Sequence, residues 1–287
     1  MKLKLTDRSP RAEKAYHSAD FLNSPVARPL RILSEFLEPF NRLRKHGIRD
    51  TIVFFGSARL KSKKDAVKQY KQVLARCKNR KRLTSSSKSQ IDEAKTALEM
   101  SRYYEDAVEL ARMLTRWSKK LYHLNRFVVC SGGGPGIMEA ANKGARWAGG
   151  RSVGLNISLP FEQSANPYVT KELAFEFHYF FMRKFWFVYL AKALIVFPGG
   201  FGTLDEFMEV LTLSQTSKIK KKITVVLYGS EYWKRVIDFP FMLKQGVVSK
   251  SDFKLFTYAD SPKEAYEYLV KELQKNYPEE TSLANGA

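Results

Sequence analysis

The sequence has few of the residues that form disulfide bonds in secreted domains or bind structural metals. Among its 287 residues are two cysteines, Cys77 and Cys130, and four histidines scattered along the chain. Two cysteines make no disulfide framework, and the histidines fit no zinc-binding spacing. We therefore expect a protein of the reducing cytoplasm that needs no metal.

Long apolar runs are lacking as well. No stretch reaches the eighteen or so residues that cross a bilayer. Residues 1–20 have no apolar segment of the signal-peptide kind, and Asp7, Glu13 and Asp20 argue against an acid-poor transit peptide. These absences predict a protein that neither enters the secretory route nor takes a membrane as its partner.

Acidic residues are scarce relative to basic ones, and the formal net charge is +20. Residues 60–102 carry 13 basic and 4 acidic side chains, whereas residues 103–287 carry 24 and 19. The excess charge therefore belongs mainly to one segment. Because that segment has few aromatic residues beyond Tyr70, a solvated surface is favoured there and nucleic acid is not an expected partner.

What the chain does contain is a set of short apolar runs alternating with helical patterns. Most runs are unbroken, as in strands buried on both faces, so the pattern predicts βαβ units and an α/β fold with a doubly wound parallel sheet. The expected strands are Thr51–Phe55, Arg126–Cys130, Ser152–Ile157, Ala193–Phe197 and Ile223–Leu227; the expected helices lie near 103–121, 137–149, 180–192, 203–216, 231–245 and 262–275.

Two segments stand apart from this alternation. Residues 1–50 resemble a helical extension in front of a nucleotide-binding α/β domain, 51–287, and residues 60–102 interrupt the first βα unit of that domain. The Lys-rich composition and the polar tract Thr84–Ser89 predict one or two exposed helices with a flexible middle. The extension offers a possible docking face, made of Phe21, Leu22, Leu30, Ile32, Leu33, Phe36 and Leu37.

Residues 194–206, Leu-Ile-Val-Phe-Pro-Gly-Gly-Phe-Gly-Thr-Leu-Asp-Glu, are the most informative stretch. A buried-strand run ends at Pro198, three glycines follow, and a helix is expected to open at Thr203. Glycines let backbone N–H groups approach a ligand closely, and a helix start adds unpaired donors and partial positive charge. The stretch therefore predicts a phosphate site with two carboxylates, Asp205 and Glu206, one turn further in.

Two more glycine turns follow predicted strands, at Gly56-Ser57 and Gly132–Gly136. Because parallel strands place their carboxyl ends at one edge, where open α/β sheets bind ligands, the turns are expected to lie together. Glu139 then has two interpretations: a residue that favours the helix dipole, or one directed at a sugar hydroxyl. Two such turns at one edge favour a ligand site.

Glu206 also has two interpretations. Thr203-x-x-Glu206 has the spacing of a capping box, in which hydroxyl and carboxylate satisfy backbone donors at the helix start. The alternative is a catalytic carboxylate. Position along the sequence favours neither interpretation.

Arg183-Lys184 lies within an expected helix that is otherwise apolar nearly all round, which indicates a buried or interfacial helix. Buried cations need partners. They would form an ion pair with Asp205, Glu206 or another acid, or they would clamp a phosphate or a transition state, for which the fork of arginine is suited. We favour the clamp.

Taken together, these motifs resemble the LOG (lonely guy) family, also described as lysine decarboxylases, and in particular its longer bacterial-type members. The resemblance runs from about Ile52 to Tyr232 and leaves out the insertion. The family signature P-G-G-x-G-T-x-x-E is complete at Pro198–Glu206. The other matching stretches are Phe55–Arg59, Ser131–Asn142, Gly154–Ile157, Glu162-Gln163 and Arg183-Lys184.

The resemblance implies a Rossmann-like fold and a hydrolase that cleaves the N-glycosidic bond of a nucleoside 5′-monophosphate, AMP or an N6-substituted AMP, without cofactor. It also implies a homodimer, or a higher oligomer, with the active site at the interface. Carried over position by position, the catalytic pair is Arg183 and Glu206. The implied phosphate-binding residues are Gly199, Gly200, Gly202 and Thr203, and those around ribose and base are Gly56, Ser57, Gly133, Gly134, Glu139, Met182 and Lys184.

Two other hypotheses remain. A nucleotide sensor or carrier would use the same glycine turns without turnover, and the basic insertion would offer it a second partner surface. A lysine decarboxylase would need pyridoxal phosphate on a Schiff-base lysine. No convincing lysine is present for that role, because Lys184 is expected beside the phosphate and Arg183.

Overall fold

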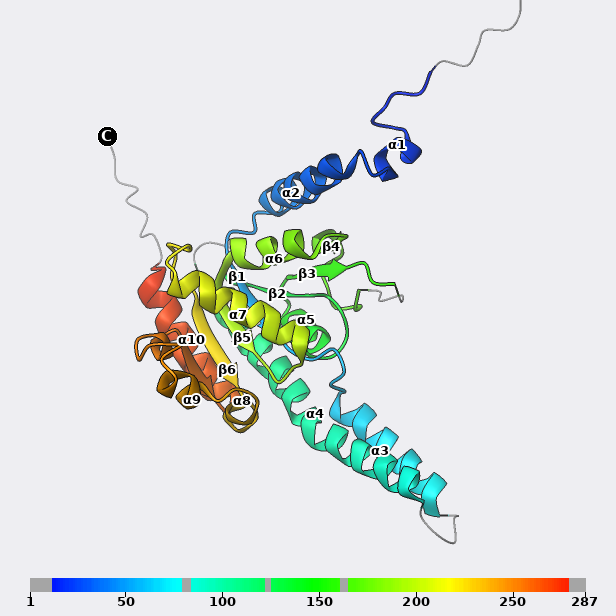
Figure 1. Ribbon diagram of the computed structural model, residues 1–287, viewed down its shortest axis with the longest axis vertical. Coiled ribbons are helices and arrows are strands. Elements are labelled where there is room, and N and C mark those ends of the chain that lie inside the picture. The colour runs from blue at the N-terminus through cyan, green and yellow to red at the C-terminus, as the bar shows by residue number, and fades with distance from the viewer. Residues whose placement is uncertain (1–11, 79–83, 122–124, 161–164, 279–287) are drawn as a thin grey trace, which may run out of the picture.

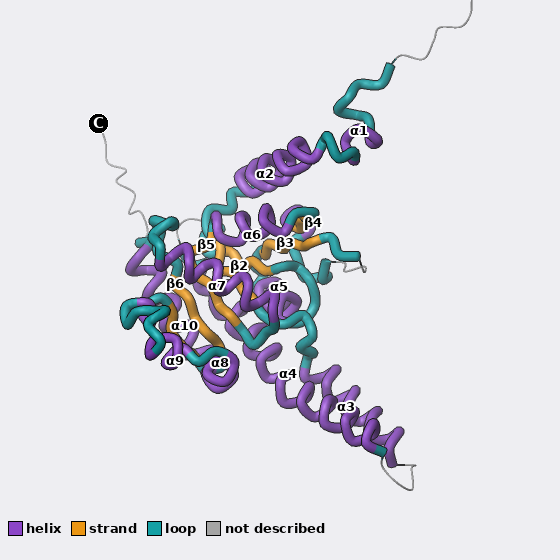
Figure 2. Tube along the Cα trace, in the orientation of Figure 1, coloured by secondary structure: helices purple, strands orange, loops and turns teal. Residues whose placement is uncertain are grey.

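The computed structural model describes residues 12–78, 84–121, 125–160 and 165–278, and within them a parallel seven-stranded sheet lies between two layers of helices (Figures 1 and 2). The fold is the expected Rossmann-like α/β architecture. Its strands are β1 (Thr51–Phe55), β2 (Val128–Ser131), β3 (Ser152–Ile157), β4 (Ala174–Phe177), β5 (Ala191–Val196), β6 (Thr224–Tyr228) and β7 (Phe256–Ala259).

The strand order is β4-β3-β2-β1-β5-β6-β7. From β1 the chain builds outward to β4, then returns to the other side of β1 with β5 and continues to β7. The order therefore reverses between β1 and β5, where Phe55 pairs with Val196. Ligands of open α/β sheets bind outside the carboxyl ends of the strands at such a reversal.

The buried side chains form two clusters, one on each face of the sheet. In β1, Val53 and Phe55 belong to one cluster while Ile52 and Phe54 belong to the other, because successive side chains of a strand point to opposite faces. The helices are α1 (Ala19–Asn23), α2 (Arg28–Lys45), α3 (Lys63–Lys78), α4 (Ser85–Ser118), α5 (Ile137–Trp147), α6 (Phe180–Tyr189), α7 (Phe201–Gln215), α8 (Ser230–Val236), α9 (Phe239–Lys244) and α10 (Pro262–Asn276).

Each cluster receives its own set of helices. Helices α6, α7, α8 and α9 contribute buried side chains to one cluster, and α4, α5 and α10 contribute to the other. The expected strands and helices are thus largely confirmed. Because α6 and α7 belong to the same layer, side chains on them can meet above one face of the sheet.

The N-terminal extension is helical, as expected, and α2 lies over α6 at the upper side of the domain in Figure 1. Phe36 contacts the rings of Phe185 and Trp186, with centroid distances of 5.5 and 6.0 Å. The docking face expected on the N-terminal extension is only partly buried against the domain, because Leu30, Leu33 and Leu37 remain exposed.

The basic insertion forms a helical hairpin that projects from the domain (Figure 1), as expected for exposed helices. The helix expected to begin at 103 begins earlier, because α4 runs unbroken from Ser85 to Ser118. Thr84 caps α4 by accepting from the Ser87 N–H at 3.2 Å. Residues 79–83, between the helices, lie outside the described residues.

Other differences from expectation have local causes. Strands β4 and β7 were missed because their side chains are only partly buried, so neither is an unbroken apolar run. The helix expected at 231–245 is two helices, since Asp238 accepts from the Phe241 N–H and starts α9. Among the described residues, no helix is both long and apolar enough to cross a membrane.

Candidate active site

Three turns that follow β1, β2 and β5 meet at the carboxyl edge, and Ser57 joins them. Its N–H donates to the Pro198 carbonyl at 3.0 Å, and its carbonyl accepts from the Ile137 N–H at 3.1 Å. An added Cβ on Gly56 would lie 2.8 Å from the Ile137 side chain. The predicted convergence of Gly56-Ser57, Gly132–Gly136 and Gly199–Gly202 is therefore confirmed.

The turn Gly132–Gly136 is held by a buried polar network. Asn166 donates from Nδ2 to the carbonyls of Gly133 and Gly134, at 2.9 and 3.0 Å, and to Oδ1 of Asn142 at 2.9 Å. The Ser131 hydroxyl donates to that same Asn142 oxygen and accepts from the Gly133 N–H. Since these groups of Gly133 and Gly134 already have protein partners, this turn is a rigid wall of the site.

The turn Gly199–Gly202, which follows β5, has more open space beside it than the turn Gly132–Gly136. Neither Gly200 nor Gly202 has any atom within 4 Å of the position that an added Cβ would take, and neither has a positive φ. Gly199 is the tight one, with its added Cβ falling 2.1 Å from the Thr203 hydroxyl. The fold alone does not require glycine at 200 and 202, so the open space beside them is available to a ligand.

The capping box, one of the two interpretations of Thr203 and Glu206, is not formed. Helix α7 begins at Phe201, two residues earlier than expected, and its N-cap is Gly200, which makes no side-chain capping bond. Thr203 is already inside the first turn and is buried. The helix start therefore keeps the free N–H groups and partial positive charge that suit an anion.

Glu206 instead forms an ion pair with Arg183, which reaches it from α6. Arg183 Nη2 donates to Glu206 Oε1 at 2.8 Å, and the two side chains are only 14% and 12% exposed. The guanidinium lies 5.3 and 5.4 Å from the ring centres of Phe180 and Phe187, while its Nε is buried without a hydrogen-bond partner. The ion pair, which the sequence analysis gave as the alternative to a clamp, is thus present within one chain.

Burial raises the pKa of the Glu206 carboxyl to about 7. Desolvation is the largest cause, because it disfavours the charged form, and the nearby Asp205 carboxylate raises the pKa further. The positive charges of Arg183 and Lys184 lower the pKa of Glu206 and so offset part of this rise. A carboxyl with a pKa close to neutral can exchange a proton under ordinary conditions, as acid–base chemistry requires.

Lys184 lies beside this pair but faces more exposed acids. Its Nζ lies 2.7 Å from Asp205 and 3.2 Å from Glu209, both on α7. These hydrogen bonds outweigh desolvation and raise the pKa of the Lys184 ammonium. Its charge is therefore neutralised on the flank of the site, which is not the setting of a Schiff-base lysine.

Glu139 lies at the start of α5 with a partner that the sequence did not suggest. It accepts a hydrogen bond of 2.6 Å from the hydroxyl of Tyr104 on α4. The ammonium of Lys143 lies 5.3 Å from the Tyr104 ring centre. Any ribose hydroxyl at Glu139 would therefore share the carboxylate with Tyr104.

The remaining expected site residues are placed as follows. Met182 is buried in the cluster beneath α6, so its side chain packs in the core. Glu162-Gln163, part of the motif set, lies outside the described residues. Within the described ranges, no group of three or more His, Cys, Asp or Glu residues could hold a metal ion. Both cysteines are free and buried.

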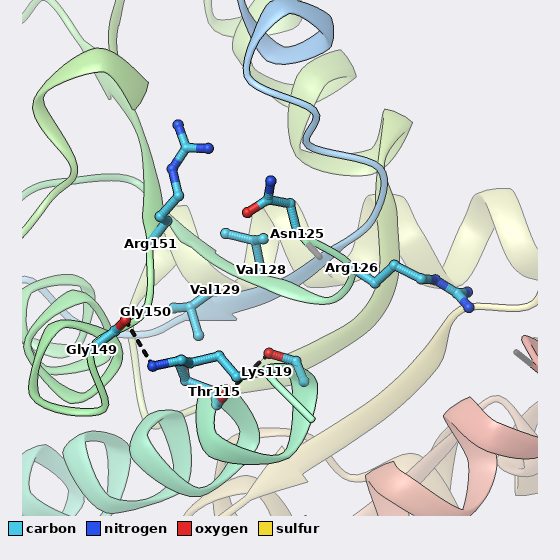
Figure 3. A pocket seen from close by; sticks show the side chains of 10 residues that line it. Thr115, Lys119, Asn125, Arg126, Val128, Val129, Gly149, Gly150 and Arg151 are labelled. Atoms are coloured by element: carbon cyan, nitrogen blue, oxygen red, sulfur yellow. Dashed lines mark hydrogen bonds between the residues drawn. The ribbon is translucent and has the colours of Figure 1, made fainter. Parts of the chain in front are cut away.

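A cavity of about 200 Å³ lies at the opposite, amino edge of the sheet, near the start of β2 (Figure 3). It is bordered by three cations, but each has a structural partner. Lys119 donates to the carbonyls of Ala148 and Gly149, and Arg126 donates to Asp50. Arg151 donates to the His46 carbonyl. Each of the three cations that border this cavity is therefore already held by a protein acceptor.

Sequence reasoning missed three residues that hold the site. Asn166 and Tyr104 are described above, and Tyr232 donates from its hydroxyl to the Gly199 carbonyl at 2.9 Å. Asn166 and Tyr232 each lie more than thirty residues from the turn they support. No local pattern could have found them.

The fold and the edge geometry define a Rossmann-like α/β protein with an open glycine turn and a helix start at its topological reversal. Comparison with known proteins shows a partial family match: residues 138–269 match the family described as "Possible lysine decarboxylase". Curated LOG proteins are among the proteins that this chain is similar to, in agreement with the resemblance of its motifs.

Two curated relatives indicate the degree of similarity. The rice protein (Oryza sativa subsp. japonica) named "Probable cytokinin riboside 5'-monophosphate phosphoribohydrolase LOGL2" is 25% identical over 186 residues, 64% of this chain and 70% of its own. LOG7 of Arabidopsis thaliana, a cytokinin riboside 5'-monophosphate phosphoribohydrolase, is 26% identical over 180 residues, 62% of this chain and 76% of its own. Among solved structures, the Moco carrier protein from Chlamydomonas reinhardtii aligns with a TM-score of 0.45 and 18% identity, covering 79% of this chain and 99% of that one.

Proposed function

We propose that this protein is a phosphoribohydrolase that cleaves the N-glycosidic bond of a nucleoside 5′-monophosphate and releases a free base and ribose 5-phosphate. The observation that carries the proposal is the pairing of Glu206 with Arg183 in a nearly buried setting, beside a helix start whose glycines have open space around them. An acid of raised pKa next to an anion site suits a phosphorylated substrate.

The phosphate is proposed to sit at the start of α7. Backbone N–H groups around Gly200, Gly202 and Thr203 would donate to its oxygens, and the helix dipole would favour its charge. The phosphate is remote from the bond that breaks. Its binding free energy would therefore position the glycosidic carbon, which is how a remote group raises the rate.

Glu206 is proposed to act on the sugar. Cleavage of the glycosidic bond builds positive charge at the ribose C1′, which an adjacent carboxylate stabilises, and the same carboxylate can orient the attacking water. Water adds to C1′ while the bond electrons and a proton leave with the base. Arg183 would hold the carboxylate in place and offer positive charge to the substrate. The reaction consumes water alone, and no cofactor is part of the proposal.

The proposed substrate is an adenine nucleotide, AMP or an N6-substituted AMP. Both relatives are named for a cytokinin riboside 5'-monophosphate, which is a nucleotide of the same general plan.

A second copy of the chain is proposed to cover the exposed side of α6. Four aromatic residues of this helix are exposed, namely Phe180, Phe181, Phe185 and Tyr189, and Phe201 at the start of α7 is 93% exposed. Apolar surface of this extent beside a polar site is typical of an interface. Light scattering on the purified protein tests the point: a dimer or larger assembly is expected, and a monomer at micromolar concentration would contradict it.

The decisive experiment incubates the protein with a panel of nucleoside monophosphates and detects released bases by chromatography. We expect adenine from AMP, or a substituted adenine from the N6-substituted nucleotide, and none from adenosine, which lacks the phosphate. Equal release from AMP and adenosine would contradict the proposed phosphate site. Saturable AMP binding with no base released over long incubation would instead identify a nucleotide sensor or carrier.

A further inference from the structure

Helix α6, which carries Arg183, does not cap its own N-terminus. Its N-cap residue, Tyr179, makes no side-chain capping bond. The first N–H groups of a helix lack partners within the helix and need acceptors from elsewhere. What supplies them decides how firmly the start of α6 is held.

The N-terminal extension supplies an acceptor for the N–H of the N-cap residue and for the N–H of the residue before it. In α2, the carboxylate of Glu35 accepts from the N–H of His178 at 2.7 Å with Oε1 and from the N–H of Tyr179 at 3.3 Å with Oε2. Both donors immediately precede α6, and a negative charge there also complements the helix dipole. One carboxylate thus holds two successive backbone groups from a helix more than 140 residues away in sequence.

The same residue holds α6 a second time. The indole Nε1 of Trp186 donates to the Glu35 backbone carbonyl at 2.9 Å, and Trp186 is almost fully buried. Arg183 lies between these two anchor points, one turn after Tyr179, to whose carbonyl its N–H donates. The position of Arg183 is therefore bracketed by contacts that α2 makes.

A third contact fixes the strand that leads into α6. Arg42 of α2 donates to the carbonyl of Ala174 at 3.0 Å, and its guanidinium lies 3.8 Å from the ring centre of Phe175. Both residues belong to β4, which is an edge strand paired on one side only with β3. Helix α2 thus braces β4 and α6 together.

We infer that Glu35 is a positioning residue for the reaction, and that α2 is part of the site's supporting frame. Glu35 acts through α6: it sets where Arg183 stands and hence how Arg183 meets Glu206 and the substrate. This inference rests on the proposed function. An error of about 1 Å in a positioned group can cost about a hundredfold in rate, so a partial loss of the brace is expected to be measurable.

The test compares Glu35→Gln and Glu35→Ala with Asp20→Asn. Asp20 is an exposed acid of α1, in the same extension, so this control removes the same charge away from α6. We expect kcat to fall by about tenfold or more in Glu35→Ala, with less loss in Glu35→Gln, whose side-chain oxygen still accepts one N–H. Asp20→Asn is expected to match the wild type. Wild-type kcat in Glu35→Ala, or an equal loss in the control, would overturn the inference.

A second readout does not depend on turnover. Phenylglyoxal modifies accessible guanidinium groups, and mass spectrometry can follow Arg183 against the exposed Arg235 as an internal reference. We expect Arg183 to react faster in both Glu35 variants and Arg235 to react at an unchanged rate. If the wild type cleaves no nucleotide, the proposed function fails, and the rate of Arg183 modification alone then tests the positioning role. An unchanged modification rate of Arg183 in the Glu35 variants would overturn that role.

Discussion

At Gly136 an added Cβ would lie 2.3 Å from the Ser57 carbonyl oxygen, whereas at Gly202 it would meet nothing within 4 Å. Gly136 has a φ of +69°, while Gly202 lies in the first turn of α7 with no positive φ. The two glycine-rich turns are similar in sequence and lie at the same edge of the sheet. The first is built for the fold, and the second leaves space that the fold does not use.

The difference shows that glycine content alone does not identify a ligand site. The first turn needs glycine because backbone from another turn packs against it. The second has glycine at positions 200 and 202, where an alanine would fit, which indicates a constraint other than folding. The two turns are therefore expected to respond differently to substitution: the first through stability and the second through binding and rate.

The largest effect is expected from the acid that follows the open turn. Glu206→Gln keeps an oxygen for Arg183 but removes the carboxylate, and we expect kcat to fall by about a thousandfold while the melting temperature stays close to wild type. Base release and thermal unfolding measure the two quantities. Full activity in this variant would refute the assigned role of Glu206.

Next comes a change within the packed turn. Gly136→Ala places a side chain at a positive φ and against the backbone of residues 57 and 58. Strain of this kind, which neighbouring backbone cannot relieve cheaply, is expected to lower the free energy of unfolding by about 2–4 kcal/mol. Denaturant unfolding measures it. A loss below about 0.5 kcal/mol would show that this turn is not packed as described.

The matched change in the open turn is Gly202→Ala. Because nothing lies near the added methyl group and alanine favours helices, stability is expected to stay the same or rise by up to about 1 kcal/mol. The methyl group would intrude on the proposed phosphate, so the affinity for ribose 5-phosphate is expected to fall by about tenfold or more. Calorimetric titration measures the affinity, and unaltered binding would place the phosphate elsewhere.

The smallest effect concerns pH. If the Glu206 carboxylate is the reactive form, activity rises with pH as Glu206 loses its proton, with a midpoint near pH 7. The Asp205 charge helps to raise this pKa, so Asp205→Asn is expected to move the midpoint to lower pH. The profile of kcat/KM between pH 5 and 9 reports the shift. Movement to higher pH would contradict the assigned electrostatics.

Most of the fold could be predicted because it rests on local patterns. Unbroken apolar runs marked β1, β2, β5 and β6, and a glycine turn after each of three strands marked the carboxyl edge. The half-buried edge strands β4 and β7 have a weaker pattern and were missed. The helix expected to begin at 103 begins earlier, since a change of composition along α4 does not require a change of structure.

For the site too, local sequence patterns identified the residues but not the contacts between them. The motif at Pro198–Glu206 and the pair Arg183-Lys184 identified which residues to examine, and whether Glu206 would serve as a cap or face Arg183 stayed open. Helix α7 starts at Phe201 in the structure, and that register places Glu206 too far into the helix to cap it. A shift of two residues in the start of a helix changes the role of a side chain near that start. Sequence patterns do not locate helix ends to within two residues.

By itself, the sequence determined the α/β class, the order of the main elements, the resemblance to the LOG family and the residues gathered at the carboxyl edge. These follow from periodicity and from motifs that are continuous in the chain. Only the tertiary structure decided that Glu206 meets Arg183, that Asn166 fills the first turn while the second stays open, and that Glu35 braces α6. Each of these is a contact between distant segments, and such contacts depend on how helices pack on a sheet.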